Sequence, residues 1–558
     1  MTMSDVESGV GGRGSGVEAG EALRLPTPDS RLSGSERILA IAIAAVTLVM
    51  RAVAFFHYRF DSDEPQHLHV VWGRTAGLLP YRDVFDNHAP LFHMAMAPLL
   101  RVFGERDDIL LYMRAPMVIL WIIVSAATFA IARRLYDTRV ALWATLLLNV
   151  LPPFFLKSIE FRTDNLWLAF WMLAVAVLVL RRRSNATFFV AGLLLGGALG
   201  VSLKTTLLLI TLGGAGAVTY WMREEAVDVR PRHVVALVAG MVIVPAMIVA
   251  YFVSRGAWSN FVYGVFRFNE LVALTRSPHV VWVPRLLFIP LLIIVLRVAW
   301  RQRRTSTTAR FFFAVATSLF FITLTSFWIL ISPRDFLPFL PFVAIFIAAA
   351  AARRSHFEFV MAVLTLVSFV AIGYYSQWLT NRTREFITME HQLLELSRPG
   401  EMVMDYKGEL IYRQRPYYFI LEFITRNAIA RGLLKDSVPE DLVRTGCHLA
   451  QADGPQWPDR GRDFMRANFI DLGRLRASGQ WLQPDGSFTI AIPGQYVILR
   501  KQGEAIGSLD GTPYRGARML AAGVHKFADA RPGERVACLW APAFARGFSP
   551  FHLRDLDF

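Results

Sequence analysis

Charged residues are scarce in this 558-residue chain. They make up 18% of the sequence, whereas apolar residues make up 54% and the mean hydropathy is positive. The apolar residues gather in repeated runs of about 20, the length that a helix needs to cross the hydrocarbon core of a bilayer. This composition excludes an ordinary soluble globule and indicates a polytopic membrane protein.

Cysteines, internal repeats and glycine-rich phosphate loops are also rare or missing. The two cysteines, Cys447 and Cys538, follow Ser376; an oxidising compartment would permit a bridge, but their spacing does not establish contact. The absence of an apparent repeat disfavours the paired-repeat layouts that are common among secondary transporters. The absence of an identifiable glycine-rich phosphate loop agrees with a protein that needs no nucleotide substrate.

Acidic residues are in the minority, with 44 Asp and Glu against 59 Lys and Arg and a formal charge of +15. The part after Ser376 is nearly balanced, with 24 basic and 21 acidic residues. The excess of positive charge therefore belongs to the part that contains the apolar segments. Basic loops of this kind orient membrane helices, and we expect no nucleic-acid partner.

Eleven apolar segments are predicted to span the membrane. They lie near residues 37–56, 114–132, 140–156, 165–180, 186–202, 205–222, 233–253, 281–299, 311–331, 335–352 and 356–376. Successive loops lie on opposite sides of the membrane. The loops of one side carry sixteen arginines, and those of the other side carry eight lysines and arginines. The arginine-rich set is expected in the cytoplasm, so the N-terminus is cytoplasmic. Because the number of spans is odd, the part after Ser376 is expected outside the cytoplasm of a multi-pass inner-membrane protein.

The parts outside the spans have distinct compositions. Residues 1–36 are rich in glycine, serine and charge, and predict a disordered cytoplasmic tail. Residues 89–103 predict a short interfacial helix, because Pro90 and Pro98 interrupt them and they are too few to cross a bilayer.

Residues 377–558 predict a small extracytoplasmic α/β domain. Helices are expected at Glu385–Leu396 and Tyr412–Ile429, and a strand at Glu401–Asp405. Phe488–Leu499 has β character, and further strands are expected after Arg518.

The loop at residues 57–113 concentrates reactive side chains. Asp61, Asp63 and Glu64 follow the first span directly, where they are either a solvated helix cap or part of a site. A carboxylate in a partly desolvated cleft beside cations can act as a general base toward a hydroxyl or an amine. Ten further polar side chains favour a site over a simple connection: His67, His69, Arg74, Tyr81, Arg82, Asp83, Asp86, Asn87, His88 and His93.

Metal binding is the alternative role for the histidines, since His67 and His69 could join Asp63 in a ligand set. Residues two positions apart face the same side only on a strand, and the chain has no HExxH-type helical pair. We therefore expect neither a metal nor another cofactor.

More ionisable residues fall at the outer ends of later spans: Glu160, Arg162, Asp164, Lys204, Arg334 and Asp335. Any one of them could simply extend its charged group to the membrane surface. Because all of them fall on the same side as the first loop, they predict one shared polar cavity. Arginine and lysine in such a cavity suit a phosphate or pyrophosphate group.

Several motifs together resemble a known family. Arg51 lies late in the first span, the pair Asp63–Glu64 opens the loop, and LLPYRDVFDNHAPLFH and LYMRAPMVIL follow. Later motifs are RTD at residues 162–164, Lys204 and SPRDFLPFLP at residues 332–341. In this order, over residues 37–376, they resemble the bacterial relatives of the protein O-mannosyltransferases and of the lipid A aminoarabinose transferases. These are membrane glycosyltransferases of the GT-C class that use polyprenyl-phosphate sugars.

The resemblance implies a helical GT-C-like membrane domain at residues 37–376 and transfer of a sugar from a polyprenyl-phosphate donor to an extracytoplasmic acceptor. Asp63 would be the general base and Glu64 would position the acceptor. The residues implied in substrate binding are Arg82, Asp86, Asn87, His88, Arg162, Asp164, Lys204 and Arg334. A transporter or flippase of lipid-linked sugars and a non-catalytic scaffold stay open as alternatives.

The loop departs from the family pattern at two places. His88 and Ala89 stand where family members usually have Lys and Pro, so a phosphate contact expected from that Lys would come from a titratable His88 or from Arg162, Lys204 or Arg334. Pro65, Gln66 and His67 follow the acidic pair in place of the more usual Gly/Ala–Tyr, which leaves the acceptor open.

Overall fold

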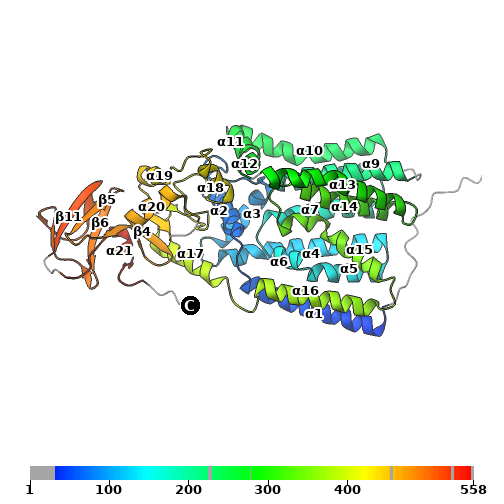
Figure 1. The fold of residues 1–558 in the computed structure, drawn as a ribbon, viewed down its shortest axis with the longest axis horizontal. Coiled ribbons are helices and arrows are strands. Elements are labelled where there is room, and N and C mark those ends of the chain that lie inside the picture. The colour runs from blue at the N-terminus through cyan, green and yellow to red at the C-terminus, as the bar shows by residue number, and fades with distance from the viewer. Residues whose placement is uncertain (1–31, 224–228, 277, 453–455, 530–532, 554–558) are drawn as a thin grey trace, which may run out of the picture.

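Long apolar helices lie side by side in the computed structural model and form most of the molecule (Figure 1). The structure describes residues 32–223, 229–276, 278–452, 456–529 and 533–553. The expected disordered tail at residues 1–36 therefore lies almost wholly outside the described residues.

Nine helical stretches of the described residues are long and apolar enough to cross a membrane. They are α1 (Gly34–His57), α4 (Ile109–Leu135), α7 (Thr163–Leu180), α9 (Thr205–Met222), α10 (Pro231–Ser254), α13 (Pro278–Gln302), α14 (Thr308–Phe327), η2 (Pro333–Phe339) continued by α15 (Leu340–Ala351), and α16 (Phe357–Ser376). The prediction of a helical polytopic membrane protein is confirmed.

The other two predicted spans are also helical but shorter. They correspond to α5 (Thr138–Val150) and α8 (Asn185–Val201). Residues 140–156 are not one helix, because the pair Pro152–Pro153 ends α5 and begins the short α6 (Pro152–Lys157). The count of eleven spans therefore stays a prediction.

Helices α8 and α10 approach each other closely through glycine. A Cβ atom at Gly192 or Gly196 would collide with a backbone carbonyl oxygen of α10, and one at Gly240 would collide with α8. Small residues at four-residue spacing let membrane helices pack backbone against backbone.

The first loop folds into α2 (Asp63–Thr75) and α3 (Leu91–Phe103), which lie at one end of the bundle (Figure 1). The expected short helix at residues 89–103 is confirmed as α3, with Pro90 as its N-cap and Pro98 inside it. At the same end lie α11 (Trp258–Val262), the π-helix η1 (Tyr263–Arg267) and α12 (Phe268–Thr275).

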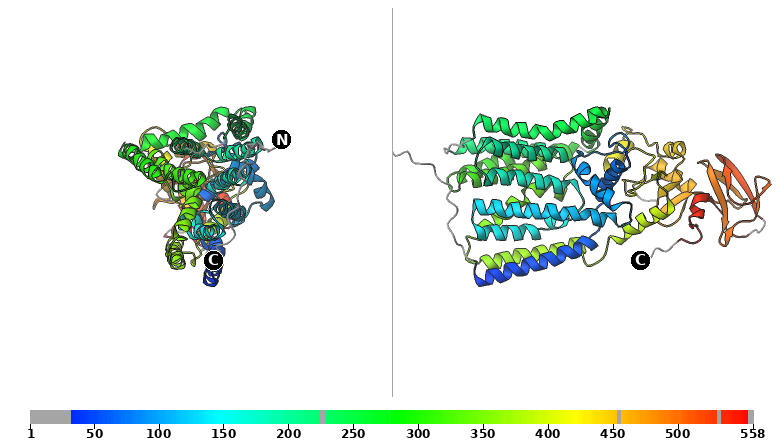
Figure 2. Two further views of the ribbon diagram at one scale, coloured as in Figure 1. Left: turned by 90° about the vertical axis from the view of Figure 1, so that its right-hand side faces the viewer. Right: turned by 180° about the vertical axis from the view of Figure 1, so that it is seen from behind.

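The part after α16 packs against that end of the bundle, as the view from behind also shows (Figure 2). Its helices are α17 (Arg384–Leu396), α18 (Phe423–Ala430), α19 (Val438–Thr445), α20 (Asp459–Asn468) and α21 (Ala541–Ala545). Because the loop and this tail share one end of the bundle, they can contribute to one site.

Two sheets form the core of the tail. The larger has the order β1 (Val403–Met404), β2 (Leu449–Gln451), β4 (Leu475–Trp481), β12 (Ala537–Trp540), β6 (Gly494–Arg500) and β10 (Arg518–Leu520), with β3 (Phe469–Asp471) on β4 and β7 (Gly503–Glu504) on β6. The smaller has the order β5 (Ser487–Ile490), β11 (Gly523–Asp529), β8 (Gly507–Leu509) and β9 (Thr512–Pro513). β1 pairs with β2 in parallel, and the other pairs are antiparallel.

The predicted tail elements are confirmed with one exception. The expected helix at Tyr412–Ile429 is wrong over most of its length, because helical structure begins only at Phe423. Pro416 lacks the backbone N–H that a helix requires, and the Tyr412 and Tyr418 hydroxyls bond to backbone of the first loop instead. Cys447 and Cys538 are both buried and do not form a bridge.

Candidate active site

A cavity of about 540 Å³ lies where the bundle, the first loop and the tail meet. Its wall is formed by the start of α2, residues 87–89, the start of α7, the turn between α8 and α9, residues 327–335 and the start of α18. Seven of the predicted site residues line it: Asp63, Asn87, His88, Arg162, Asp164, Lys204 and Arg334. Of the six residues of later spans that were expected to share one polar cavity with the loop, five line it and Glu160 does not.

Asp63 is held between two cations. The Arg162 guanidinium, at the N-cap of α7, and the Lys407 ammonium, from the tail, both form ion pairs with its carboxylate. Burial alone would raise the pKa of Asp63, but the charges of Arg162 and Lys407 lower it well below its usual value. Asp63 is therefore ionised at neutral pH and able to accept a proton.

A second carboxylate organises the two arginines. Asp61 Oδ1 accepts from Arg162 Nη1 at 2.9 Å, and Asp61 Oδ2 lies 2.5 Å from Arg334 Nη2. Arg334 Nε also donates to Glu160 Oε2 at 3.0 Å. These contacts explain how two arginines from distant helices hold fixed positions in one wall.

Lys204 shares the Asp164 carboxylate with Arg162. Its ammonium forms an ion pair with Asp335 and lies 3.4 Å from Asp164 Oδ1. Burial would lower the pKa of Lys204, but these carboxylates raise it. Lys204 is thus a positive charge held in a fixed position at the cavity.

Glu64 lies behind this cavity and does not line it. Its side chain is 0% exposed and accepts hydrogen bonds from Arg114 Nε at 2.9 Å and Arg114 Nη2 at 2.6 Å. The backbone N–H groups of Asp61 and Phe161 also donate to it, each at 2.9 Å. With its lone pairs occupied, Glu64 fixes the start of α2 against α4 and α7.

Asp86 and the histidines form a second cluster at the loop. Asp86 Oδ1 accepts from the backbone N–H of His88 and lies 3.0 Å from His88 Nδ1. Asp86 Oδ2 lies 3.2 Å from His93 Nδ1, and His93 Nε2 lies 3.0 Å from His67 Nδ1. Asp86 does not line the cavity but holds His88, which does.

Arg82 also lies outside the cavity. It is exposed and pairs with its neighbour Asp83 at 2.9 Å. Within the described residues, no group of three or more His, Cys, Asp and Glu side chains has a geometry that could hold a metal ion.

The structure adds residues that sequence reasoning missed. Glu422, Asn269 and Arg276 line the cavity, and Lys407 contacts Asp63 from behind its wall. Lys407 lies 344 positions from Asp63 in a tail of ordinary soluble composition, so no local pattern distinguishes it. The pairing depends on how the tail docks, which the sequence does not show.

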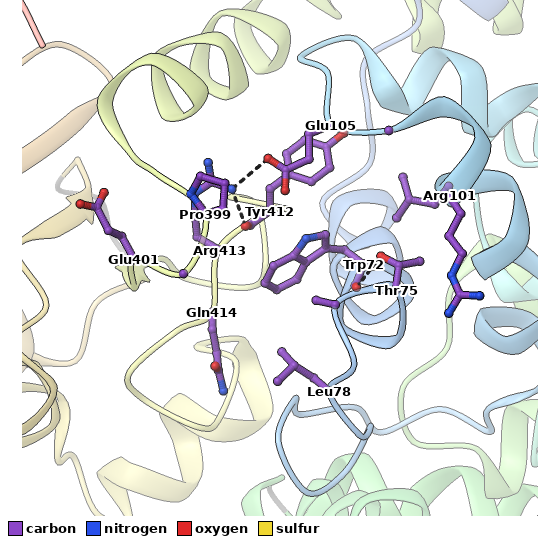
Figure 3. Close-up of a pocket in the computed structure, with 14 residues that line it drawn as sticks. Trp72, Thr75, Leu78, Arg101, Glu105, Pro399, Glu401, Tyr412, Arg413 and Gln414 are labelled. Carbon is purple, nitrogen blue, oxygen red and sulfur yellow. Dashed lines mark hydrogen bonds and ion pairs between the residues drawn. The ribbon is translucent and has the colours of Figure 1, made fainter.

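Figure 3 shows how the tail is attached beside a second cavity of about 440 Å³. Arg413 Nη1 donates to Glu105 at 3.1 Å, and the Tyr412 hydroxyl bonds to both backbone groups of Arg106 at 2.9 and 3.0 Å. We refer to residues 405–414, where they meet α2 and residues 104–106, as the docking seam.

Comparisons with known proteins agree with this architecture. The family model of dolichyl-phosphate-mannose-protein mannosyltransferase matches residues 87–252. ArnT from Cupriavidus metallidurans bound to undecaprenyl phosphate is 13% identical, with a TM-score of 0.53 over 80% of this chain and 98% of ArnT. Its apo state is 15% identical, with a TM-score of 0.52 over 79% and 98%. No curated protein sequence matches the chain.

These comparisons confirm the resemblance to GT-C glycosyltransferases that the first loop indicated. The chain has the ArnT fold along nearly the whole length of ArnT. The family match begins at Asn87, within the loop, and ends in α10.

Proposed function

We propose that this protein is an integral-membrane inverting glycosyltransferase that transfers a sugar from a polyprenyl-phosphate donor to an extracytoplasmic acceptor. The acceptor is a glycolipid, a polysaccharide or a protein. The observation that carries the proposal is the combination, in one cavity, of an ionised carboxylate with three fixed cations: Asp63 with Arg162, Lys204 and Arg334.

The reaction follows from this arrangement. The acceptor hydroxyl attacks the anomeric carbon, its proton passes to Asp63, and the bond from that carbon to the phosphate oxygen breaks. A single displacement inverts the anomeric centre. The departing lipid phosphate is already a good leaving group, so fixed cations that neutralise its charge supply most of the remaining stabilisation.

The residues beside Asp63 take supporting parts in this scheme. We propose that Arg162, Lys204 and Arg334 bind the phosphate and that Asn87, His88 and Asp164 shape its site. Glu64 and Asp86 act from behind the wall by fixing α2 and His88, and Arg82 has no contact with the cavity. The ArnT structure with undecaprenyl phosphate supports a lipid-phosphate ligand for this fold.

The function is tested with purified protein, a panel of undecaprenyl-phosphate-linked hexoses and pentoses, and cell-envelope fractions as acceptors. Mass spectrometry should detect free undecaprenyl phosphate and a glycosylated acceptor for at least one donor. Failure to consume any lipid-linked sugar would contradict the proposal, and transport of an intact donor across vesicles would favour a flippase.

His88 should make donor binding depend on pH. Its side chain is 29% exposed at the cavity, and its Nδ1 is close to the Asp86 carboxylate. A protonated imidazole attracts a phosphate and a neutral one does not, so the affinity for the undecaprenyl-phosphate sugar, a phosphodiester, should weaken as the pH rises. His88→Lys should remove most of this dependence. Flat, superimposable binding curves would mean that His88 does not contact the phosphate.

The tail should lie outside the cytoplasm. The positive-inside rule predicts this orientation, and the shared end of the loop and tail requires both to be on one side (Figure 1). An alkaline phosphatase fused after Arg500 should be active, and a cytoplasmic reporter at the same position should be inactive. The opposite pattern would place the site in the cytoplasm.

A further inference from the structure

One segment of the tail reaches the base of the proposed reaction. The Lys407 ammonium forms an ion pair with Asp63 and lies 3.5 Å from Glu422 Oε2. The Lys407 side chain is only 9% exposed. An ion pair that is largely shielded from water affects its partner more strongly than a surface pair does.

The turn that carries Lys407 is built to present it. The buried Asp405 carboxylate accepts the backbone N–H of Gly408 at 3.0 Å and that of Leu410 at 2.9 Å. Gly408 has φ of +90°, a conformation that other residues rarely adopt, and a Cβ atom there would lie 3.0 Å from the His69 side chain. The turn therefore passes against α2 where only glycine fits well.

The docking seam holds this turn in place. His69 Nδ1 of α2 lies 2.9 Å from the carbonyl oxygen of Ile411, and the Ile411 N–H donates to Glu390 at 3.0 Å. The bond from Arg413 to Glu105 (Figure 3) and that from Tyr412 to Arg106 continue the attachment. Lys407 thus has a fixed position relative to Asp63.

We propose that Lys407 is a positioning residue of the active site, which keeps the Asp63 carboxylate ionised and aimed at the acceptor hydroxyl. The inference rests on the proposed glycosyl transfer and extends it: the site is complete only when the tail is docked. No covalent step is assigned to Lys407, whose ammonium stays protonated throughout.

The charges around Asp63 give the sign of the effect. Arg162 and Lys407 face it as cations, Asp61 lies in the same cluster, and His67 is one turn further along α2. Burial would raise the pKa of Asp63, and the two cations lower it. Without Lys407, the pKa of Asp63 should rise. A base works only above its pKa, so the loss of activity on acidification should then begin at higher pH.

The test is the pH profile of kcat/KM for the full-length protein, from about pH 3 to 8 so that the usual titration range of a carboxylate is included, with the undecaprenyl-phosphate sugar that the wild type turns over fastest. In Lys407→Met the acidic limb should move up by about 1–3 pH units, the usual influence of one nearby opposite charge. Lys407→Arg should restore the limb toward the wild-type position. Lys501→Met, at an exposed lysine of the same tail, is the matched control and should leave the profile unchanged.

If activity of Lys407→Met falls on acidification at the same pH as activity of the wild type, the inference is overturned, whether or not the rate itself is lower. A lower rate without a shift of the pH profile would show that Lys407 only holds the tail in place. If the pH profile of Lys407→Arg matched that of Lys407→Met, a role for the positive charge would also be excluded. Failure of the proposed function has a different signature, since the wild type would then consume no lipid-linked sugar at any pH, and this inference would fall with it.

Discussion

Asp63→Asn should lower the rate of glycosyl transfer by about 10²–10⁴, the usual contribution of a general base. The amide keeps the shape of the carboxylate but cannot take up the acceptor proton. Initial rates with a polyprenyl-phosphate sugar, at matched protein concentration and at neutral pH, measure the effect. Near wild-type turnover would show that Asp63 is not the base.

Asp61→Asn is the matched control for that experiment. Asp61 shares Arg162 with Asp63 and is close in sequence, but it does not line the cavity. Asp61→Asn should lower the rate less than Asp63→Asn does, because it only weakens the contacts that hold Arg162 and Arg334 in place. If Asp61→Asn abolished transfer and Asp63→Asn did not, the roles of the two carboxylates would be exchanged.

Arg114→Met should destabilise the fold by about 3–5 kcal/mol, because it leaves the Glu64 carboxylate buried without its partner. Both side chains are 0% exposed. Arg114 also donates to the carbonyl oxygens of Tyr58 at 2.9 Å and Arg59 at 3.0 Å, at the end of α1. Thermal unfolding in detergent and the yield of monodisperse protein measure the loss.

The double variant Glu64→Gln with Arg114→Met separates the two possible causes. The amide that replaces the Glu64 carboxylate is neutral and leaves no unpaired charge, so the double variant should be more stable than Arg114→Met alone. An Arg114→Met protein that unfolds at the wild-type temperature would show that the pair does not hold the loop.

Much of the bundle could be predicted from the sequence because apolar runs are a strong signal for helices in lipid. All eleven predicted segments are helical, and the main error within them was the break at Pro152. The tail gave a weaker signal. Residues 412–422 were expected to be helical, but Tyr412 and Tyr418 bond instead to the backbone of the first loop.

Part of the site could also be predicted, because the apolar segments show which residues lie at the ends of the helices. Residues near the ends of neighbouring helices meet once the orientation of the helices is known, and Arg162, Lys204 and Arg334 do meet. Charge and position did not distinguish residues in the cavity from residues behind it. Glu64 is next to Asp63 in sequence, yet the helical rotation of about 100° per residue turns it toward Arg114.

The separation of 344 residues between Asp63 and Lys407 also sets an order of events during synthesis. At about 5–20 residues per second, a ribosome needs roughly 20–70 s to proceed from one to the other. Throughout that interval, a nascent chain already inserted in the membrane has its loop but no tail lysine beside the base. If Lys407 acts as proposed, a chain that stalls or is cut before residue 407 should transfer sugar slowly, so incomplete chains would consume little of the donor.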